Sequence, residues 1–544
     1  MKFSVLIGGK ASDGIEKSSI ILAKSLIKLG FYCFVYREYG SYIKGGHDFS
    51  ILTFSDRKVN SHEKYLDLIL AFDKSSAEKH ENELKNGGII ICGEEYKSKN
   101  CIFLNYKEII QKLNAPEITK NSAFLGAFFK TFNLPLEPLL EEIRKEIGEI
   151  NEKVAKISYE NFNFSSKKIS LPKNSKTGKK LFLDGTSAVG LGSIYYGLDF
   201  YFAYPMTPAT KLLHFLSSLR EKYDIKTFLL ENEIAVVNAS IGSNFGGAIS
   251  MVGTSGGGFD LMAETLSLQG MTEVPLVIYL AQRYGPSTGM PTYTSQSDLN
   301  SAIYSGHGDF QKVVVAPGDA EEAFEKTVEA FYLSYKYGIL SIILSDKHLA
   351  ESYFTLDSLK KPKIKPSKFI VENPKDYKTY KITKNYVPIR TFLTKFMVKC
   401  NSYEHDEFGF TTDKKEIAKI MQEKRIKKFE VLKKEVESKF EMYKVFGRGK
   451  NLIISFGSNK GAILDALEDL PNYKYLHITY LSPLPTKIIE SESSKASKIY
   501  VIECNSSSQF YNLIKPYLKK NAINILKYDG RPFTPEEILE NLKR

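Results

Sequence analysis

Residues 231–299 read ENEIAVVNASIGSNFGGAISMVGTSGGGFDLMAETLSLQGMTEVPLVIYLAQRYGPSTGMPTYTSQSDL, and the rest of the chain is arranged around them. It begins with two carboxylates, Glu231 and Glu233, directly after an apolar run. A strand-like run at 248–252 then leads into the glycine-rich turn 254–258. A short apolar strand followed by a glycine turn is typical of α/β proteins, which bind ligands where their strands end.

The stretch closes with a loop at 282–292, QRYGPSTGMPT, which carries one cation, Arg283. Gly and Pro at this density argue against a regular helix or strand. Loops that follow a strand hold many of the binding and catalytic groups of α/β proteins. We therefore expect the chemistry of this protein within 231–299.

Strand and helix patterns alternate on both sides of this stretch. Apolar runs of strand length occupy 199–204, 227–230, 248–252, 276–281, 312–315 and 340–344. Helical spacing of apolar residues occurs at 188–197, 209–219, 232–243, 261–268 and 320–335. The alternation predicts a largely parallel sheet with helices on both faces, in a domain that spans 181–350.

Residues 1–160 predict a separate α/β domain. It begins with a strand at 3–7, a glycine turn at 8–14 and a helix at 16–29. The turn lacks the full G-x-G-x-x-G spacing, so a tight turn without a nucleotide is the favoured interpretation. The polar, lysine-rich residues 161–180 predict a linker.

The C-terminal third predicts a connector and one more α/β domain. Residues 351–445 contain a basic, proline-broken segment and a long charged helix at 414–440, which we expect to form a surface arm. Strand and helix patterns then place the last domain at 446–544. The predicted fold class is therefore α/β, with three α/β domains.

Composition narrows the class of protein. Of the 544 residues, 43% are hydrophobic and 25% charged, as in ordinary globular proteins. No apolar run is long enough to span a bilayer, and the start MKFSVLIGG is interpreted as a strand rather than a signal peptide. We expect a cytoplasmic protein with no membrane partner.

The net charge of +12 has two explanations. Nucleic-acid binding is one, but no basic run is interleaved with aromatic residues, so we predict no nucleic-acid partner. A lysine-rich organism or an acidic partner protein is the favoured explanation. A basic surface would steer an acidic electron carrier toward the protein.

The cysteines are scattered, at positions 33, 92, 101, 400 and 504, with no Cys-x-x-Cys. This spacing argues against an iron–sulfur or zinc site built by this chain alone, so we predict no metal site here. Five thiols fit a reducing compartment. If the protein transfers electrons, we expect another chain to carry the cluster.

Several short motifs occur in the order found in one known family. They are REY at 37–39 with GGH at 45–47, YPMTP at 204–208, ENE at 231–233, TSG at 254–256, the loop at 282–292, GHGDF at 306–310, EHDEFG at 404–409 and DGRPF at 529–533. With them, nearly the whole chain resembles the α subunit of a 2-oxoacid:ferredoxin oxidoreductase with the family's γ domain fused in front. The resemblance implies a γ domain at 1–160, a thiamine-diphosphate-binding, pyrimidine-type domain at 181–350 and a transketolase C-terminal-like domain at 446–544.

The resemblance also implies an activity. A 2-oxoacid would be decarboxylated oxidatively with coenzyme A to acyl-CoA and CO2, and two electrons would pass to ferredoxin. Thiamine diphosphate would be shared with a β subunit, which is expected to carry Mg and a [4Fe–4S] cluster, in a dimer of αβ heterodimers. The loop form GPSTGMPT at 285–292 is more similar to the 2-oxoglutarate and broad 2-oxoacid branch than to the pyruvate branch.

Glu233 matches the family's catalytic carboxylate. A buried carboxylate that hydrogen-bonds N1′ of the aminopyrimidine favours the imino tautomer, which is needed to remove the proton at C2 of thiamine. On spacing alone, the favoured explanation of Glu231 and Glu233 is that they are carboxylates stabilised by a helix N-terminus. The motif at 204–208 adds Tyr204 and Pro205 as expected cofactor contacts.

Arg283 matches the family position that binds the substrate's carboxylate, for which a guanidinium fork is the best partner. Thr207 and Thr292 match threonines that contact the substrate. The alternative is a surface ion pair for the arginine and turn or helix caps for the threonines. His307 and His405 are interpreted as structural, because neither has a metal-spaced partner.

Two departures from the family keep alternatives open. GGKA at 8–11 stands where the family usually has GGQG, and KFMVKC at 395–400 replaces a glycine-rich segment. They motivate a non-catalytic interaction subunit as an alternative. A member specific for pyruvate or indolepyruvate is a separate alternative, because side-chain specificity depends on the shape of the pocket and on the partner. An NAD-dependent dehydrogenase would need the full dinucleotide fingerprint, which the turn at 8–14 lacks.

Overall fold

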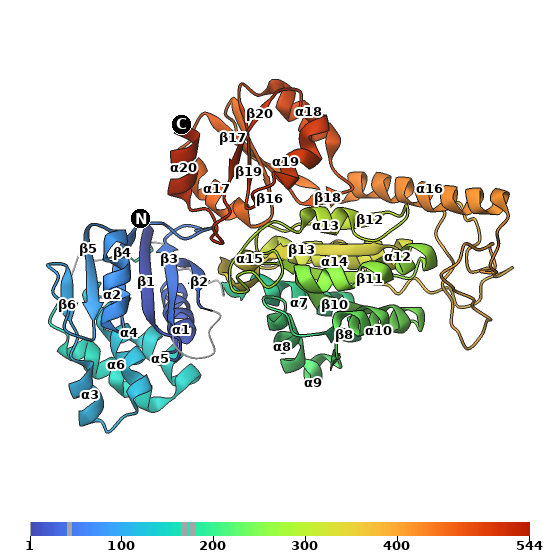
Figure 1. Ribbon diagram of the computed structural model, residues 1–544. Helices are drawn as coiled ribbons and strands as arrows, with labels where there is room; N and C mark the ends of the chain where they lie inside the picture. Colours follow the sequence, from blue (N-terminus) through green and yellow to red (C-terminus); the bar gives the residue numbers. More distant parts are fainter. Residues whose placement is uncertain (1, 41–45, 165–168, 170, 173–179, 544) are drawn as a thin grey trace.

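Three β-sheets organise the protein in a computed structural model that describes residues 2–40, 46–164, 169, 171–172 and 180–543 (Figure 1). The N-terminal lobe, blue in Figure 1, lies beside the middle lobe, which is green to yellow, and the red C-terminal lobe lies above them in this view. The predicted α/β class is confirmed.

The N-terminal sheet has eight strands in the order β6-β5-β4-β1-β3-β2-β14-β7. Its strands are β1 (Lys2–Lys10), β2 (Tyr32–Glu38), β3 (His47–Ser55), β4 (Leu66–Ala71), β5 (Leu84–Cys92), β6 (Cys101–Phe103), β7 (Leu181–Asp184) and β14 (Tyr353–Leu356). The helices of this lobe are α1 (Ile15–Lys28), α2 (Lys74–His80), α3 (Tyr106–Lys112), α4 (Lys120–Thr131), α5 (Glu137–Ile147) and α6 (Glu149–Asn161). Side chains alternate across β1, so Val5 and Ile7 pack with α1 and α4, whereas Leu6 joins the core of the middle lobe.

Strands β7 and β14 tie the first two lobes together. The sequence patterns place both outside the N-terminal domain, yet β14 pairs antiparallel with β2 and with β7. The glycine turn expected at 8–14 also starts later, because β1 continues to Lys10. Most of the predicted linker 161–180, and residues 41–45 of the REY…GGH motif, lie outside the described residues.

The middle sheet has seven strands in the order β18-β12-β13-β11-β10-β8-β9. They are β8 (Phe200–Ala203), β9 (Lys226–Leu229), β10 (Ser250–Thr254), β11 (Leu276–Gln282), β12 (Lys312–Val315), β13 (Leu340–Asp346) and β18 (Tyr480–Ser482). The helices are α7 (Gly185–Tyr196), α8 (Thr210–Ser218), α9 (Arg220–Tyr223), α10 (Glu233–Phe245), α11 (Gly256–Leu261), α12 (Ala263–Thr272), α13 (Leu299–Tyr304), α14 (Ala320–Tyr337) and α15 (Lys347–Glu351). All neighbours are parallel except β18, which pairs antiparallel with β12, so the predicted largely parallel sheet is confirmed.

The C-terminal sheet has five strands in the order β15-β17-β16-β19-β20. Its elements are β15 (Tyr443–Gly447), β16 (Asn451–Phe456), β17 (Tyr473–Ile478), β19 (Ile499–Glu503), β20 (Ala522–Leu526), α17 (Lys460–Leu467), α18 (Thr486–Lys495), α19 (Gln509–Ile514) and α20 (Pro535–Lys543). Strand β18 leaves this lobe to join the middle sheet, so the two lobes share backbone hydrogen bonds.

Helix α16 (Lys415–Lys439) forms where the charged helix is predicted, but it is not a solvated arm on all sides. Lys424 and Lys428 lie buried, each 2.5 Å from a carboxylate oxygen of Glu273 at the end of α12. Leu432 and Val436 are also fully buried. The surface-arm interpretation is therefore wrong for this face, because a buried carboxylate neutralises lysines that the sequence pattern assigns to solvent.

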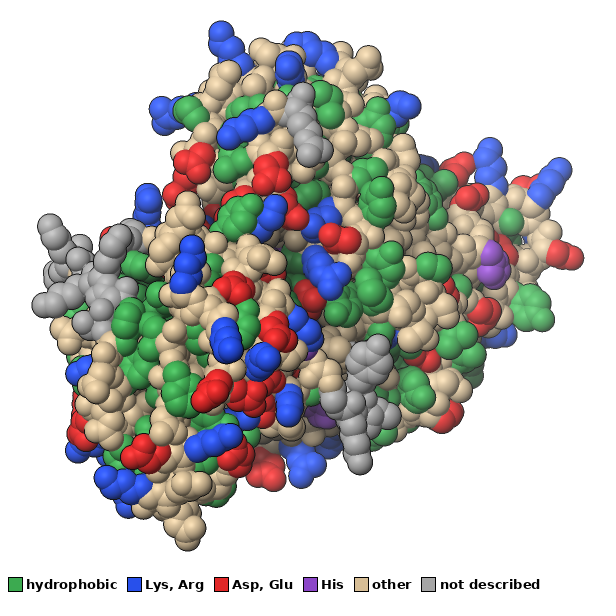
Figure 2. Space-filling view, turned by 60° about the vertical axis from the view of Figure 1, so that its left-hand side comes forward, with side chains coloured by type: hydrophobic (Ala, Val, Ile, Leu, Met, Phe, Trp, Pro, Cys, Tyr) green, Lys and Arg blue, Asp and Glu red, His purple; other side chains and the backbone are tan. Residues whose placement is uncertain are grey.

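The charge distribution on the surface and the length and apolarity of the helices can be compared with the predictions about nucleic-acid and membrane partners. On the face drawn in Figure 2, basic and acidic side chains are interspersed rather than gathered by sign. No helix in the described part of the chain combines the length and apolarity that a bilayer crossing requires.

Candidate functional site

The predicted site residues gather at one edge of the middle sheet. Thr207 follows β8, Arg283 follows β11, and Glu233 begins α10 just after β9. Because these strands are parallel, their carboxyl ends meet at the same edge, where α/β proteins bind ligands. The chain thus places on one edge residues that are up to 76 positions apart in the sequence.

Glu233 carries a buried carboxylate with an unpaired oxygen. It occupies the first turn of α10, and the side chain of Asn232 caps that helix by accepting from the Ala235 N–H at 2.9 Å. Glu233 is 3% exposed, and its Oε1 has no hydrogen-bond partner within the described residues. A buried, unpaired oxygen of this kind costs folding free energy, so a group from outside the described structure is its natural partner.

A glycine leaves room for this carboxylate. A Cβ at Gly258, in the first turn of α11, would lie 2.5 Å from Glu233 Oε1 and 2.3 Å from Thr254 Oγ1. Ser255 Oγ is also buried, and the described residues offer it no hydrogen-bond partner. These polar groups fit an aminopyrimidine, because its ring N1′ needs a carboxylate oxygen that has no other hydrogen-bond partner.

Arg283 and Thr207 are joined directly. Arg283 Nη1 donates to the carbonyl oxygen of Thr207 at 3.0 Å, so the loop after β11 is tied to the loop after β8. Burial lowers the pKa of Arg283, while Asp298 opposes this shift. One of the five guanidinium N–H donors is used in this bond, which leaves capacity for a carboxylate ligand.

Thr292 lies nearby but its hydroxyl is already engaged. It is 5% exposed, and Oγ1 donates to the carbonyl oxygen of Tyr39 in the N-terminal lobe at 2.8 Å. A hydroxyl has a single hydrogen to donate, so in this arrangement Thr292 can only accept from a ligand. The threonine predicted to contact substrate therefore also connects two lobes.

Tyr204 and Pro205 follow β8 at the same edge and are exposed, and Tyr204 is 40% exposed. Large apolar side chains of β9, α10 and α11 are also exposed. These are Phe228, Leu229, Ile234 and Leu261, whose exposed fractions range from 40% to 63%. Exposed apolar side chains on the elements that build a polar site are typical of a surface that another chain covers.

Asp298 is a neighbour that the sequence patterns do not identify. Its carboxylate packs on α11, where a Cβ at Gly256 would lie 2.6 Å from Oδ2, and its N–H donates to Gln282 Oε1 at 3.0 Å. Burial, with help from Asp260, raises the pKa of Asp298 to about 6, while Arg283 opposes the shift. In the sequence, Asp298 stands directly before α13, and an Asp at such a position is ordinarily interpreted as a helix N-cap.

The histidines and cysteines of the described residues form no metal-binding cluster. His307 is exposed, whereas His405 is fully buried with Nδ1 3.0 Å from the Tyr403 carbonyl oxygen. All five cysteines are free thiols. Within the described residues, no group of three or more His, Cys, Asp and Glu side chains is arranged to hold a metal ion.

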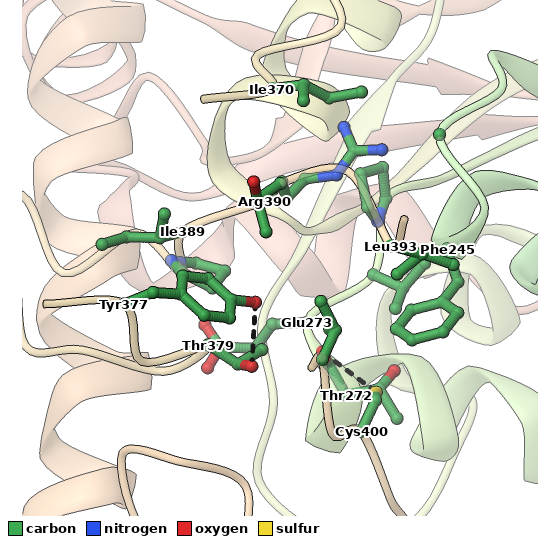
Figure 3. Close-up of a pocket in the computed structure, with 16 residues that line it drawn as sticks. Phe245, Thr272, Glu273, Ile370, Tyr377, Thr379, Ile389, Arg390, Leu393 and Cys400 are labelled. Carbon is green, nitrogen blue, oxygen red and sulfur yellow. Dashed lines mark hydrogen bonds between the residues drawn. The ribbon is translucent and has the colours of Figure 1, made fainter. Parts of the chain in front are cut away.

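A cavity of about 40 Å³ lies away from this edge, between the connector and the middle lobe (Figure 3). Phe245 and Thr272 line it from the middle lobe, and Tyr377, Arg390 and Cys400 line it from the connector. None of the predicted site residues lines this cavity. It belongs to the packing of the connector on the middle lobe.

Comparison with known proteins places the chain in a family. Residues 191–431 match the family described as "Pyruvate flavodoxin/ferredoxin oxidoreductase, thiamine diP-bdg", and residues 4–163 match "Pyruvate ferredoxin/flavodoxin oxidoreductase". A 2-oxoacid:ferredoxin oxidoreductase subunit alpha from Sulfolobus sp. is 33% identical over 100% of this chain and 96% of its own length. The chain belongs to the 2-oxoacid:ferredoxin oxidoreductase family.

Two further relatives of this family bear on the architecture. A 2-oxoglutarate:ferredoxin oxidoreductase from Magnetococcus marinus, solved with 2-oxoglutarate, coenzyme A and succinyl-CoA bound, matches with a TM-score of 0.90 and 25% identity, over 100% of this chain and 99% of that chain. The 2-oxoglutarate synthase subunit KorA of Methanocaldococcus jannaschii is 29% identical over 66% of this chain and 97% of its own length. The predicted family is thus confirmed, and a KorA-type subunit accounts for only part of this longer chain.

Proposed function

We propose that this chain is the α subunit, with a fused γ-type N-terminal domain, of a 2-oxoacid:ferredoxin oxidoreductase. The complex oxidises a 2-oxoacid with coenzyme A to acyl-CoA and CO2, and it passes two electrons to ferredoxin. The observation that carries the proposal is the unpaired, buried Oε1 of Glu233, on the same sheet edge as Arg283 and Thr207.

Glu233 is the proposed catalytic carboxylate. Thiamine diphosphate, when bound, supplies the electron sink that decarboxylation of a 2-oxoacid requires. Glu233 Oε1 holds the proton at ring N1′ and so selects the tautomer that reacts. Glu233 lies in the first turn of α10, which fixes the direction of its side chain, and burial excludes water from the carboxylate.

Arg283, Thr207 and Thr292 are the proposed substrate residues. The guanidinium of Arg283 binds the carboxylate of the 2-oxoacid, and the carbonyl oxygen of Thr207 holds that guanidinium in place. The hydroxyl of Thr207 donates to the substrate's oxo group, and Thr292 fixes the loop. Tyr204 and Pro205 contact the cofactor from the open side of the site.

A partner subunit completes the site in this proposal. The exposed apolar side chains of β9, of α11 and of α10, the helix that Glu233 begins, favour a covering chain, and we assign Mg and a [4Fe–4S] cluster to it because no metal-binding group occurs among the described residues here. The complex is then a dimer of αβ heterodimers in the cytoplasm. Ferredoxin, an acidic carrier, would approach a chain of net charge +12.

The proposed substrate is 2-oxoglutarate or a broad range of 2-oxoacids. The loop form at 285–292 supports this choice, as does the similarity to a structure with 2-oxoglutarate and succinyl-CoA bound. A member specific for pyruvate or indolepyruvate is the nearest alternative. A non-catalytic interaction subunit is the alternative from another class, motivated by the divergent GGKA turn and connector.

The test uses the chain co-purified with its partner subunit. Acyl-CoA formation is measured over 2-oxoglutarate, pyruvate, indolepyruvate and a branched 2-oxoacid, with ferredoxin as acceptor. We expect 2-oxoglutarate to be used and R283A to abolish turnover, whereas R57A, at an exposed arginine of the N-terminal lobe, retains it. Unchanged activity in R283A would favour the interaction subunit, and oxidation by this chain alone would refute the assignment of the cluster to a partner.

A further inference from the structure

The end of strand β2 reaches out of the N-terminal lobe to the substrate loop. Glu38 ends the strand, and the carbonyl oxygen of the next residue, Tyr39, accepts the hydroxyl hydrogen of Thr292 at 2.8 Å. The two residues are 253 positions apart. The loop that carries Arg283 and Thr292 is therefore held by a domain that supplies none of the proposed catalytic groups.

Helix α15 holds Tyr39 in turn. The Tyr39 hydroxyl donates to Glu351 Oε1 at 2.8 Å, and Glu351 is 5% exposed. Lys347, one turn earlier, lies 3.6 Å from Glu351 and donates to the carbonyl oxygen of Arg37 at 2.5 Å. Since α15 directly follows β13, the neighbour of β11, it provides a rigid base next to the substrate loop.

The C-terminal lobe holds the same segment from another side. Arg531 Nη2 donates to Glu38 Oε1 at 2.9 Å, and its guanidinium lies 4.9 Å from the centre of the Tyr293 ring. The N–H of Thr294 donates to the carbonyl oxygen of Gly530 at 2.9 Å. Residues 292–294 are thus fixed one after another by the N-terminal and C-terminal lobes.

We propose that Tyr39 is a positioning residue of the substrate site, which acts by holding Thr292 and through it the loop of Arg283. The inference rests on the proposed function and adds a role for the N-terminal domain within it. The hydroxyl of Tyr39 fixes the residue on Glu351, and its carbonyl oxygen fixes the substrate loop. A loop that loses this anchor presents Arg283 to the substrate's carboxylate in more than one position, which weakens binding of the 2-oxoacid.

The experiment replaces Tyr39 in the purified complex with its partner subunit. Y39F removes one hydroxyl and leaves the backbone carbonyl in place. We expect KM for the 2-oxoacid to rise about tenfold, the equivalent of about 1.4 kcal/mol, with KM for coenzyme A unchanged. Y32F is the matched control, because Tyr32 lies at the other end of β2 and its hydroxyl donates to Asp357 at 2.8 Å, in the same pair of lobes.

A double-mutant cycle separates positioning from a general loss of stability. If Tyr39 acts through Glu351, E351A raises the KM for the 2-oxoacid as Y39F does. In the Y39F background, E351A then causes no further rise. E351Q keeps an oxygen that accepts from the Tyr39 hydroxyl, so it should retain most of the affinity for the 2-oxoacid. Equal KM values in Y39F and Y32F would overturn the inference, as would a parallel rise in both substrates' KM with a lowered Tm. A wild-type complex that oxidises no 2-oxoacid would instead refute the proposed function.

Discussion

The space beside Glu233 gives a sharp prediction for Gly258→Ala. The added Cβ would lie 2.3 Å from Thr254 Oγ1 and 2.5 Å from Glu233 Oε1. Carbon and oxygen atoms do not approach this closely without contact strain, so both side chains must move by about 1 Å. The Glu233 carboxylate is the one that the cofactor is proposed to need in place.

The magnitude of the effect differs between stability and activity. Gly258 lies in α11 with an ordinary helical φ, and alanine is favoured over glycine in a helix by about 1 kcal/mol. Overpacking costs about 1–3 kcal/mol, so the net loss of stability is about 0–2 kcal/mol. A displacement of about 1 Å in a catalytic group can cost on the order of 10²-fold in rate.

We therefore expect G258A to fold and to lose on the order of 10²-fold in kcat, measured as 2-oxoacid-dependent ferredoxin reduction by the complex. Gly257→Ala is the matched control. Gly257 lies on the same helix, and a Cβ there would meet no atom within 4 Å. Thermal unfolding of both variants checks that they are folded. Equal activity of G258A and G257A would refute the role given to the carboxylate's position.

Two further predictions concern buried charges. Burial alone would raise the pKa of Glu273, but the two lysines of α16 outweigh it and lower the pKa to about 2. The carboxylate therefore stabilises the fold above pH about 4.5, and this stabilisation is lost as the pH falls toward 2. At pH 7, E273Q should lower the free energy of unfolding measured in urea by about 3–5 kcal/mol. E423Q, at a side chain of α16 that is 45% exposed, should cost under about 1 kcal/mol, so equal costs would contradict the buried pairing. Asp298, with a pKa near 6, should compete with substrate for Arg283 only when ionised, so KM for the 2-oxoacid should fall as the pH drops from 7 to 5. D298N should show a low KM throughout, and a wild-type KM independent of pH would refute this competition.

Periodicity predicts most of the fold because most elements are defined by local patterns. The apolar run 276–281 is β11, and the spacing at 320–335 is α14. Strands β7 and β14 have four residues each, and their place in the N-terminal sheet depends on pairing between distant segments. No local pattern contains that information, and the same holds for the lysines of α16 that are neutralised by Glu273.

The site was predicted only in part for a related reason. Spacing alone does not distinguish Glu233 from a carboxylate favoured by a helix N-terminus, and burial with an unpaired Oε1 is what separates the two. The resemblance to a family points to Arg283 and Thr292, but the bond from Thr292 to Tyr39 joins two lobes. Such a contact follows from how the lobes pack, which single-residue motifs do not describe.

Hydrogen–deuterium exchange at C2 of thiamine diphosphate bound to the complex, measured by acid quench and NMR, tests the proposed role of Glu233. We predict that E233Q slows this exchange by about 10²–10⁴-fold. E231Q, which changes an exposed carboxylate two residues earlier, should leave it unchanged. Exchange in E233Q as fast as in the wild-type complex would contradict the proposal that the unpaired carboxylate of Glu233 promotes removal of the C2 proton.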